Sequence, residues 1–301
     1  MSAATEATLV DTELEELSDQ RSLTEKCRNL ARKNPLGAFG AAIAVVMVFA
    51  AIFADVITTH SPIDIAWEHQ LVSPNFEFLL GTDQLGRDIF SRIVYGARTA
   101  LLVGITASVV GAFIGLILGV ASAYFGGTFD LLFQRVMDVF MAFPLIILAL
   151  AIVSIFGGGI DKVIIAITVP FIPRCARVVR SNALAIREIP YVDAARAMGF
   201  SHSRIILRHM VPNVMAPFLI MITAFVGQAI LTEASLSYLG MGVQEPTPAW
   251  GLMLQGGAEE YAESAPWVPI FPGLAITLAV FGFNLFGDSV RDTLDPRLRS
   301  Q

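Results

Sequence analysis

Five long runs without a charged residue limit how this chain can fold. Each run is close to or above the roughly 20 residues that a helix needs to cross a bilayer. They are Leu36–Ala54, Thr99–Thr128, Val139–Ile160, Met210–Thr232 and Ser264–Gly287. Only 15% of the residues are charged, against about 25% in soluble proteins. The sequence therefore predicts an all-α, multi-pass membrane protein.

A sixth apolar segment decides the number of crossings. It spans a membrane only if it extends over Val163–Ser181, with Arg174, Arg177 and Arg180 reaching the inner interface; otherwise it is re-entrant. With six spans, 16 of the 20 basic residues lie on one side of the membrane. With five spans, 14 lie outside. Because cytoplasmic loops carry an excess of Lys and Arg, six transmembrane helices with both termini cytoplasmic are favoured.

The polar loop between the fourth and fifth spans contains the pattern Pro190-Tyr-Val-Asp-Ala-Ala-Arg-Ala-Met-Gly199. Proline suits the first position of a helix, and glycine suits the left-handed position after its end. Ser201 then suits the cap of a second helix. Four residues at helical spacing form a small apolar stripe on one face. They are Tyr191, Ala194, Ala195 and Met198, and arginines flank the stripe. This elbow is predicted to be a cytoplasmic docking site; the alternative is an ordinary surface helix turning a corner.

Several kinds of chemistry have no visible place in the sequence. No glycine precedes Lys26, Lys33 or Lys162, so a phosphate-binding GxxxxGK[ST] loop is excluded. Neither a GxSxG nor an HExxH motif occurs, and no catalytic residue or metal site is predicted. We therefore expect a conduit, sensor or scaffold that receives energy from a partner or an ion gradient.

Seven sequence blocks carry a resemblance to a known family. They are Leu80-Gly-Thr-Asp-Gln-Leu-Gly-Arg-Asp88, Tyr95-Gly-Ala-Arg98, Asp193-Ala-Ala-Arg-Ala-Met-Gly199, Leu236-Ser-Tyr-Leu-Gly-Met-Gly242, Pro246-Thr-Pro-Ala-Trp-Gly251, Asn284-Leu-Phe-Gly-Asp288 and Arg291-Asp-Thr-Leu-Asp-Pro296. Together they resemble the C-type permease subunit of dipeptide/oligopeptide ABC importers, from about Asn34 to Arg297. One departure is Asp193, where the family motif usually has glutamate; because both are carboxylates, we expect docking to survive.

The resemblance implies a type I ABC importer permease of MetI-like fold in the cell membrane. It implies pairing with a second permease, two ATPase subunits that bind ATP and Mg, and an extracytoplasmic binding protein that delivers peptides; no nucleic acid is involved. This chain itself needs no cofactor. The exact cargo is left open among dipeptides, oligopeptides, glutathione, nickel chelates and opine-like compounds.

The resemblance also assigns candidate site residues. The elbow becomes the helix that couples the permease to an ATPase, with contacts from Pro190, Tyr191, Asp193, Ala194, Ala195, Arg196, Met198 and Gly199. Asp193 serves there as a cap or a polar contact, or else is simply solvated. Glu233, near the outer end of the fifth span, is a candidate gate or lining residue that can also reach water by snorkelling.

The domain organisation follows from these segments. Residues 1–34 are a partly disordered cytoplasmic tail, 35–60 the first transmembrane helix, and 61–98 an extracytoplasmic loop with an amphipathic helix carrying Arg87 and Arg92 on its polar side. Residues 99–288 form the permease core, with the coupling loop at 181–212, and 289–301 a cytoplasmic tail. Within the core, Gly111, Gly115 and Gly119 permit close helix packing.

Two other classes of protein remain as alternatives. A self-contained secondary transporter or channel should show paired charges deep in its spans or interrupted helices in repeated halves. A membrane scaffold could have the same cytoplasmic loop without taking part in uptake. The outer segment Gln244–Trp267 contains Glu245, Glu259, Glu260 and Glu263 without a basic residue. These acids indicate a solvated face; the alternatives are contacts with basic groups of a binding protein or with the amino terminus of a peptide.

Overall fold

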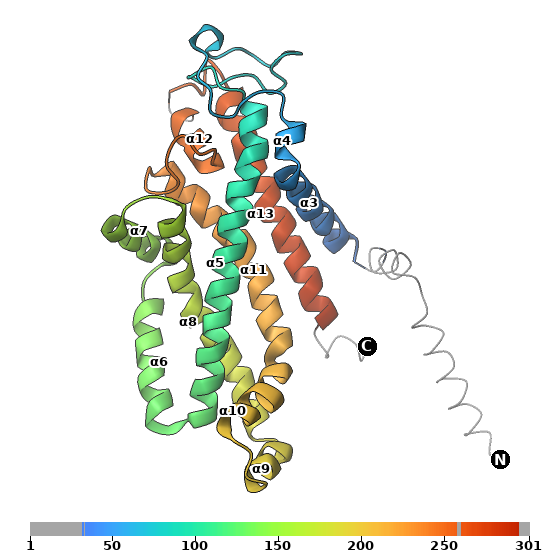
Figure 1. Cartoon of the computed structure of the whole chain (residues 1–301), viewed down its shortest axis with the longest axis vertical. Coiled ribbons are helices and arrows are strands. Elements are labelled where there is room, and N and C mark those ends of the chain that lie inside the picture. The colour runs from blue at the N-terminus through green and yellow to red at the C-terminus, as the bar shows by residue number, and fades with distance from the viewer. Residues whose placement is uncertain (1–31, 33, 258–259, 295–301) are drawn as a thin grey trace, which may run out of the picture.

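The structure is a computed structural model that describes residues 32, 34–257 and 260–294, and these form helices joined by loops (Figure 1). The longer helices are α3 (Pro35–Ile52), α5 (Ile89–Phe125), α6 (Gly127–Met141), α7 (Leu145–Phe156), α8 (Ile160–Arg187), α11 (Met215–Tyr238) and α13 (Trp267–Leu294). The shorter ones are α4 (Ala54–Ile57), η1 (Trp67–His69), α9 (Pro190–Ala197), α10 (His202–Ile205), the π-helical η2 (Ile206–Met210), η3 (Val211–Val214) and α12 (Trp250–Gly257).

Four continuous helical stretches are long and apolar enough to cross a membrane. They are α3, α5, the run from α10 to the end of α11, and α13. The pair α6 and α7 adds a fifth if it counts as one bent span. Helix α8 is 28 residues long but carries several arginines in its second half. The multi-pass helical architecture agrees with the sequence, whereas the count of six spans stays a prediction.

The predicted third span differs most from expectation. The uncharged run Val139–Ile160 is not one helix, because α6 ends at Met141, α7 begins at Leu145, and their axes are bent by 88°. Pro144 lies at the break with an extended backbone conformation. Since proline has no backbone N–H and disfavours helix in the residue before it, Pro144 favours a break at this position.

The predicted fourth span is longer than expected. Helix α8 extends past Ser181 to Arg187, so Arg174 lies midway along it rather than at its inner end. Pro170 and Pro173 lie within the helix one turn or less before that arginine. Contacts with α6 and α11, described below, take the place of the predicted interface for these arginines.

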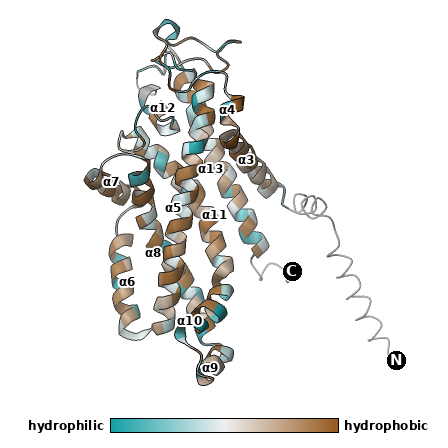
Figure 2. Ribbon diagram, in the orientation of Figure 1, coloured by the Kyte–Doolittle hydropathy of each residue, from teal (hydrophilic) through white to brown (hydrophobic). Residues whose placement is uncertain are grey.

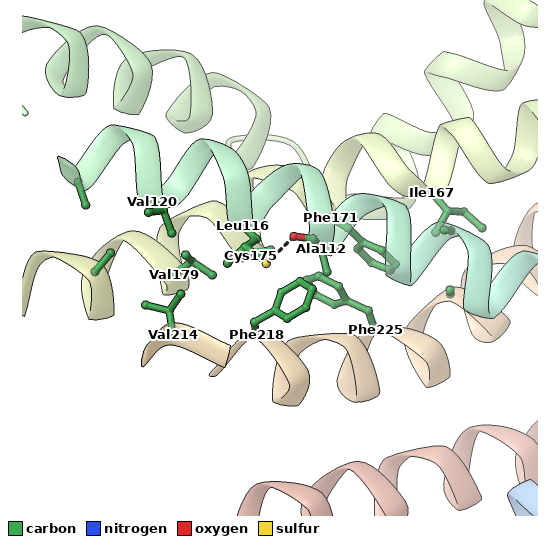
Figure 3. Close-up of a cluster of buried hydrophobic side chains, with 14 of the residues drawn as sticks. Ala112, Leu116, Val120, Ile167, Phe171, Cys175, Val179, Val214, Phe218 and Phe225 are labelled. Carbon is green, nitrogen blue, oxygen red and sulfur yellow. Dashed lines mark hydrogen bonds between the residues drawn. The ribbon is translucent and has the colours of Figure 1, made fainter. Parts of the chain in front are cut away.

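Glycines bring α5 and α8 into close contact, as the sequence predicts. A β-carbon added at Gly115 would lie 2.6 Å from Cβ of Cys175, and one at Gly119 would lie 2.5 Å from the carbonyl oxygen of Ala176. Both helices also meet α11 in the apolar cluster of Figure 3. There Phe171 and Phe225 stack with their ring centroids 4.2 Å apart. These three helices form the centre of the molecule.

The two ends of the bundle differ in structure. Loop residues 58–88 and α12 lie at one end, which we call the loop end, and α9 and α10 lie at the other, which we call the elbow end (Figure 1). Figure 2 shows hydrophilic residues gathered at both ends and apolar helices between them. This distribution is the one expected of a chain whose middle is embedded in lipid.

A separate amphipathic helix in residues 61–98 is absent from the described structure. Residues 89–98 are instead the first turns of α5, which is continuous for 37 residues. Asp88 caps this helix by accepting a hydrogen bond of 2.9 Å from the backbone N–H of Ser91. The arginine expected on a polar surface, Arg92, is fully buried.

Candidate functional site

The elbow is built from local signals in the sequence. Pro190 opens α9 in its first turn, and Gly199 follows its end with φ of 76°. The N–H of Phe200 bonds to the carbonyl of Ala195 at 3.2 Å, and the N–H of Gly199 bonds to that of Arg196 at 2.9 Å. This pair of bonds is the Schellman arrangement that stops a helix at a glycine. The predicted helix and turn are confirmed.

The second arm of the elbow also forms as predicted. The hydroxyl of Ser201 accepts a hydrogen bond of 3.4 Å from the backbone N–H of Arg204, which caps α10. The guanidinium of Arg204 lies over the ring of Phe200, 4.1 Å from its centroid. The turn between the helices is therefore held by a cap, a backbone motif and a ring contact.

The predicted stripe does not lie on one exposed face. Ala195 is buried together with Val192, and both belong to the central apolar cluster. Tyr191, Ala194 and Met198 are exposed, with Met198 at 66%. The expectation that four residues present one face to a partner is wrong for Ala195, because α9 uses its Val192–Ala195 side to pack on its own chain. The exposed face available to a partner is centred on Ala194 and Met198.

Tyr191 fixes α9 to the segment that returns toward the bundle. Its hydroxyl donates a hydrogen bond of 3.0 Å to the carbonyl of His209. The side-chain amide of Asn213 donates to both the Tyr191 hydroxyl, at 3.1 Å, and the same carbonyl, at 2.7 Å. These bonds join two segments about 20 residues apart, so the elbow is held as a unit.

The charged residues of α9 are placed outside its packed face. Asp193 forms an exposed ion pair with Arg196, with 3.2 Å between the oxygen and the nitrogen, and it does not cap the helix. The guanidinium of Arg196 lies 5.1 Å from the ring centroid of Tyr124 at the end of α5. The Tyr124 hydroxyl is 2.7 Å from Nδ1 of His202. Arg196 therefore connects the elbow to the end of a long helix.

Glu233 lies inside the bundle rather than at a wet helix end. Its side chain is only 1% exposed, and Oε1 accepts a hydrogen bond of 2.7 Å from the hydroxyl of Ser237. That hydroxyl in turn accepts the N–H of Val243 at 3.1 Å. The expectation that Glu233 reaches water by snorkelling is wrong, and its role as a gate or lining residue stays a prediction.

Comparison with protein families decides what kind of protein carries this elbow. Residues 111–300 match the family described as the binding-protein-dependent transport system inner membrane component. The chain belongs to this family. Residues 31–74 also match the N-terminal transmembrane domain of oligopeptide transport permease C. The protein is thus a transport permease, as its resemblance to the C-type peptide permeases implies.

Individual relatives cover most of the permease. A putative peptide transport system permease of Brucella abortus is 45% identical over 87% of this chain and 88% of its own length. A dipeptide transport system permease of Alkalihalophilus pseudofirmus is 43% identical over 89% of this chain and 88% of its own length. A glutathione transport system permease of Pectobacterium atrosepticum is 44% identical over 75% of each chain.

A solved structure supports the fold. The MetNI methionine ABC transporter in an inward-facing conformation aligns with a TM-score of 0.54, covering 68% of this permease and 96% of that chain. The sequence identity is 21%, so the likeness concerns the fold alone. The MetI-like fold implied by the sequence is consistent with this match.

An ion-pair network at the loop end was missed by sequence reasoning. The side chain of Arg87 bonds to Asp83 at 2.7 Å and to Glu245 at 2.9 Å. Arg92 lies 3.8 Å from the first carboxylate and 3.6 Å from the second, and it donates to the carbonyl of Pro62 at 2.9 Å. The i,i+4 spacing of Asp83 and Arg87 could have indicated one pair, but no local signal links them to Glu245.

Glu245, expected only as part of a solvated acidic face, is 46% exposed but also pairs with Arg87 and Arg92. Trp250 belongs to the same region, is 4% exposed and donates its indole N–H to the carbonyl of Ile93 at 2.9 Å. The segment between α11 and α12 is therefore packed onto the start of α5.

Proposed function

We propose that the permease is one transmembrane subunit of an ATP-driven importer of di- and oligopeptides. It pairs with a second permease and rests on two ATPase subunits, which bind the ATP and Mg that this chain does not. A binding protein delivers peptide to the loop end. The names of the relatives support the peptide cargo, and the family supports the dependence on a binding protein.

The rigid elbow is the observation that carries the coupling role. Helix α9 buries one face on its own chain, is closed by the Gly199 turn and is bonded through Tyr191 to the returning segment. Its other face carries the small residue Ala194 and the flexible residue Met198, both exposed. A partner can approach a small residue closely, and methionine adapts to an apolar groove. A push on this face therefore moves the whole elbow.

Coupling proceeds by rigid-body motion. When ATP draws the two ATPase subunits together, each elbow moves with the subunit that holds it, and the helices connected to the elbow follow. The ends of α5 and α8 receive the motion because Arg196 contacts Tyr124 and α8 runs directly into α9. The two permeases then rock between inward-open and outward-open states. Because the ATPase subunits are cytoplasmic, the proposal places the elbow end and both termini on the cytoplasmic side of the membrane.

Purification of the tagged permease from native membranes in mild detergent tests the proposal, with mass spectrometry of the bound proteins. We expect a second permease and two ATPase subunits to copurify with the wild type. The substitution Gly199→Asp should release the ATPases while the two permeases stay together. A side chain at φ of 76° is strained, and a charge in an apolar groove is costly.

Gly127→Asp is the matched control. Gly127 also has positive φ, of 57°, and no atom would lie within 4 Å of a new β-carbon at either position. The control variant should retain the ATPases. Retention of the ATPases by Gly199→Asp, or isolation of the wild type alone or as a homo-oligomer, contradicts the coupling role and favours a self-contained transporter or channel.

A further inference from the structure

Three of the arginines in the second half of α8, Arg174, Arg177 and Arg180, have different partners. Arg177 pairs with Asp138 and Arg180 pairs with Asp130, and both acids belong to α6. Arg174 instead donates one hydrogen bond of 3.1 Å to the side-chain oxygen of Gln228 on α11. Within residues 34–257 and 260–294, no carboxylate lies within ion-pair distance of Arg174. Its positive charge is therefore left without a compensating anion.

Arg174 lies deep in the bundle. Helix α8 starts beside the turn after α11, where the N–H of Gly159 bonds to the carbonyl of Gly242 at 3.1 Å, and it ends at the elbow. At 1.5 Å per residue, Arg174 is about 20 Å from either end of the helix. A charge at such a depth in a membrane faces the protein interior or a water-filled cavity rather than lipid.

The face of α8 that carries Arg174 changes at this residue from buried to partly exposed. Toward the loop end, the residues on this face are buried: Val163, Ile167 and Pro170. Toward the elbow end, the residues at four, seven and eleven positions after Arg174 are half-buried or exposed: Val178, Ser181 and Ala185. Val178 is apolar, but Ser181 is polar and Ala185 is small, so the part of this face nearest the elbow end suits a water-filled path.

Helix α11 changes from buried to partly exposed at Gln228, the residue that bonds to Arg174. Thr232, one turn beyond Gln228 toward the loop end, is buried. In the other direction Ala224 is exposed, and Met221 and Pro217 are half-buried. The hydrogen-bonded pair Arg174–Gln228 thus lies where two helices pass from a covered half to an open half that leads to the elbow end.

We infer that Arg174 and Gln228 form a binding site for the carboxylate of the transported peptide, within the pathway through the permease. Every linear peptide carries a carboxylate at its C-terminus, and a guanidinium has five N–H donors arranged to bind one through two bonds. Only one N–H donor of Arg174 forms a hydrogen bond in the structure, and its partner is the neutral side chain of Gln228. The amide nitrogen of Gln228 supplies a further donor beside it. This inference rests on the proposed peptide cargo.

The test measures uptake by proteoliposomes that contain the complete importer, with trialanine and trialanine amide each saturating the binding protein. The wild type should import the free acid about tenfold faster than the amide, because a charge-assisted hydrogen bond is lost with the amide. Arg174→Gln should slow the uptake of trialanine and leave the uptake of trialanine amide unchanged, so that the ratio of the two rates approaches one. Arg174→Lys should keep part of the preference.

Arg177→Gln is the matched control, because Arg177 lies on the same helix and already has an acid as partner. Its ratio of acid to amide uptake should equal that of the wild type. An unchanged ratio in Arg174→Gln overturns the inference, and so does loss of the second permease from that variant, which would place Arg174 at the subunit interface. Failure of the wild type to import either peptide instead contradicts the proposed cargo.

Discussion

At the scale of single residues, charge pairs hold the loop end together. Arg92 is buried with two side-chain nitrogens, Nε and Nη2, that have no hydrogen-bond partner among the described residues. The carboxylates of Asp83 and Glu245 lie within 4 Å of it and supply the opposite charge. A buried arginine is tolerated only with such compensation. The network therefore fixes the segment before α12 against the start of α5.

Removal of one acid should destabilise this region. Glu245→Gln leaves Arg87 and Arg92 with less opposing charge, and we expect a loss of about 1–3 kcal/mol in the free energy of unfolding. Thermal unfolding in detergent measures the change as a lower melting temperature. Glu263→Gln removes an exposed carboxylate and serves as the control. Equal melting temperatures for both variants would show that the network contributes little.

A second charge pair should make stability depend on pH. The first candidate span ends at Ile52, short of the predicted bound at residue 60, so Asp55 lies outside it in the short α4. Hydrogen bonds from Arg98 and Tyr95 lower the pKa of Asp55. A carboxylate whose pKa is lowered by folding contributes stability above its unfolded pKa and loses it as pH falls through the folded value. The melting temperature should therefore fall less between pH 7 and pH 3 in Asp55→Asn than in the wild type. The difference should be small because the pair is exposed, and a larger fall in the variant contradicts the assignment.

At the scale of helices, the α5–α8 contact depends on glycine. Gly119→Ala would place a methyl group 2.5 Å from a backbone oxygen of α8, which forces the helices apart. We expect about 1–3 kcal/mol of destabilisation, as for overpacked cores. Gly273→Ala in α13, where the nearest atom is 3.9 Å away, should be tolerated. Melting temperatures of the two variants provide the comparison, and equal values would mean that α5 and α8 are not held at this distance.

Helix-level features differ in how far the sequence predicts them. Pro190 starts α9 and Gly199 ends it, and both effects depend on the conformation of the residue itself, so the elbow follows from local rules. The burial of Ala195 does not, because which side of a short helix packs on the protein depends on distant residues such as Ile205 and Met210. The break at Pro144 has a local signal, but a run without charges hides it when spans are found by hydropathy alone.

At the scale of the whole molecule, distance along the chain limits prediction. Apolar runs identify the helices that form the body of the bundle, and family motifs identify their kind. The pairing of Arg87 with Glu245 joins residues 158 positions apart, and nothing near either one indicates the other. The position of Arg174 also depends on the length of α8, which the sequence understates because arginines interrupt the apolar run while the helix continues to Arg187.

As a whole, the permease is proposed to be a body that moves when its elbow is moved. In the proposed function, loops at one end receive cargo, a central set of three helices forms the body, and α9 at the far end transmits force. We claim that the exposed face of α9 lies against an ATPase subunit.

Site-specific photo-crosslinking tests this claim most directly. A photoreactive amino acid replaces Met198, which is 66% exposed at the elbow end, or Val56, which is 82% exposed near the loop end, in the assembled complex. We predict a crosslink from position 198 to an ATPase subunit and none from position 56. Labelling of an ATPase from position 56, or none from position 198 in a complex that contains ATPases, would contradict the account.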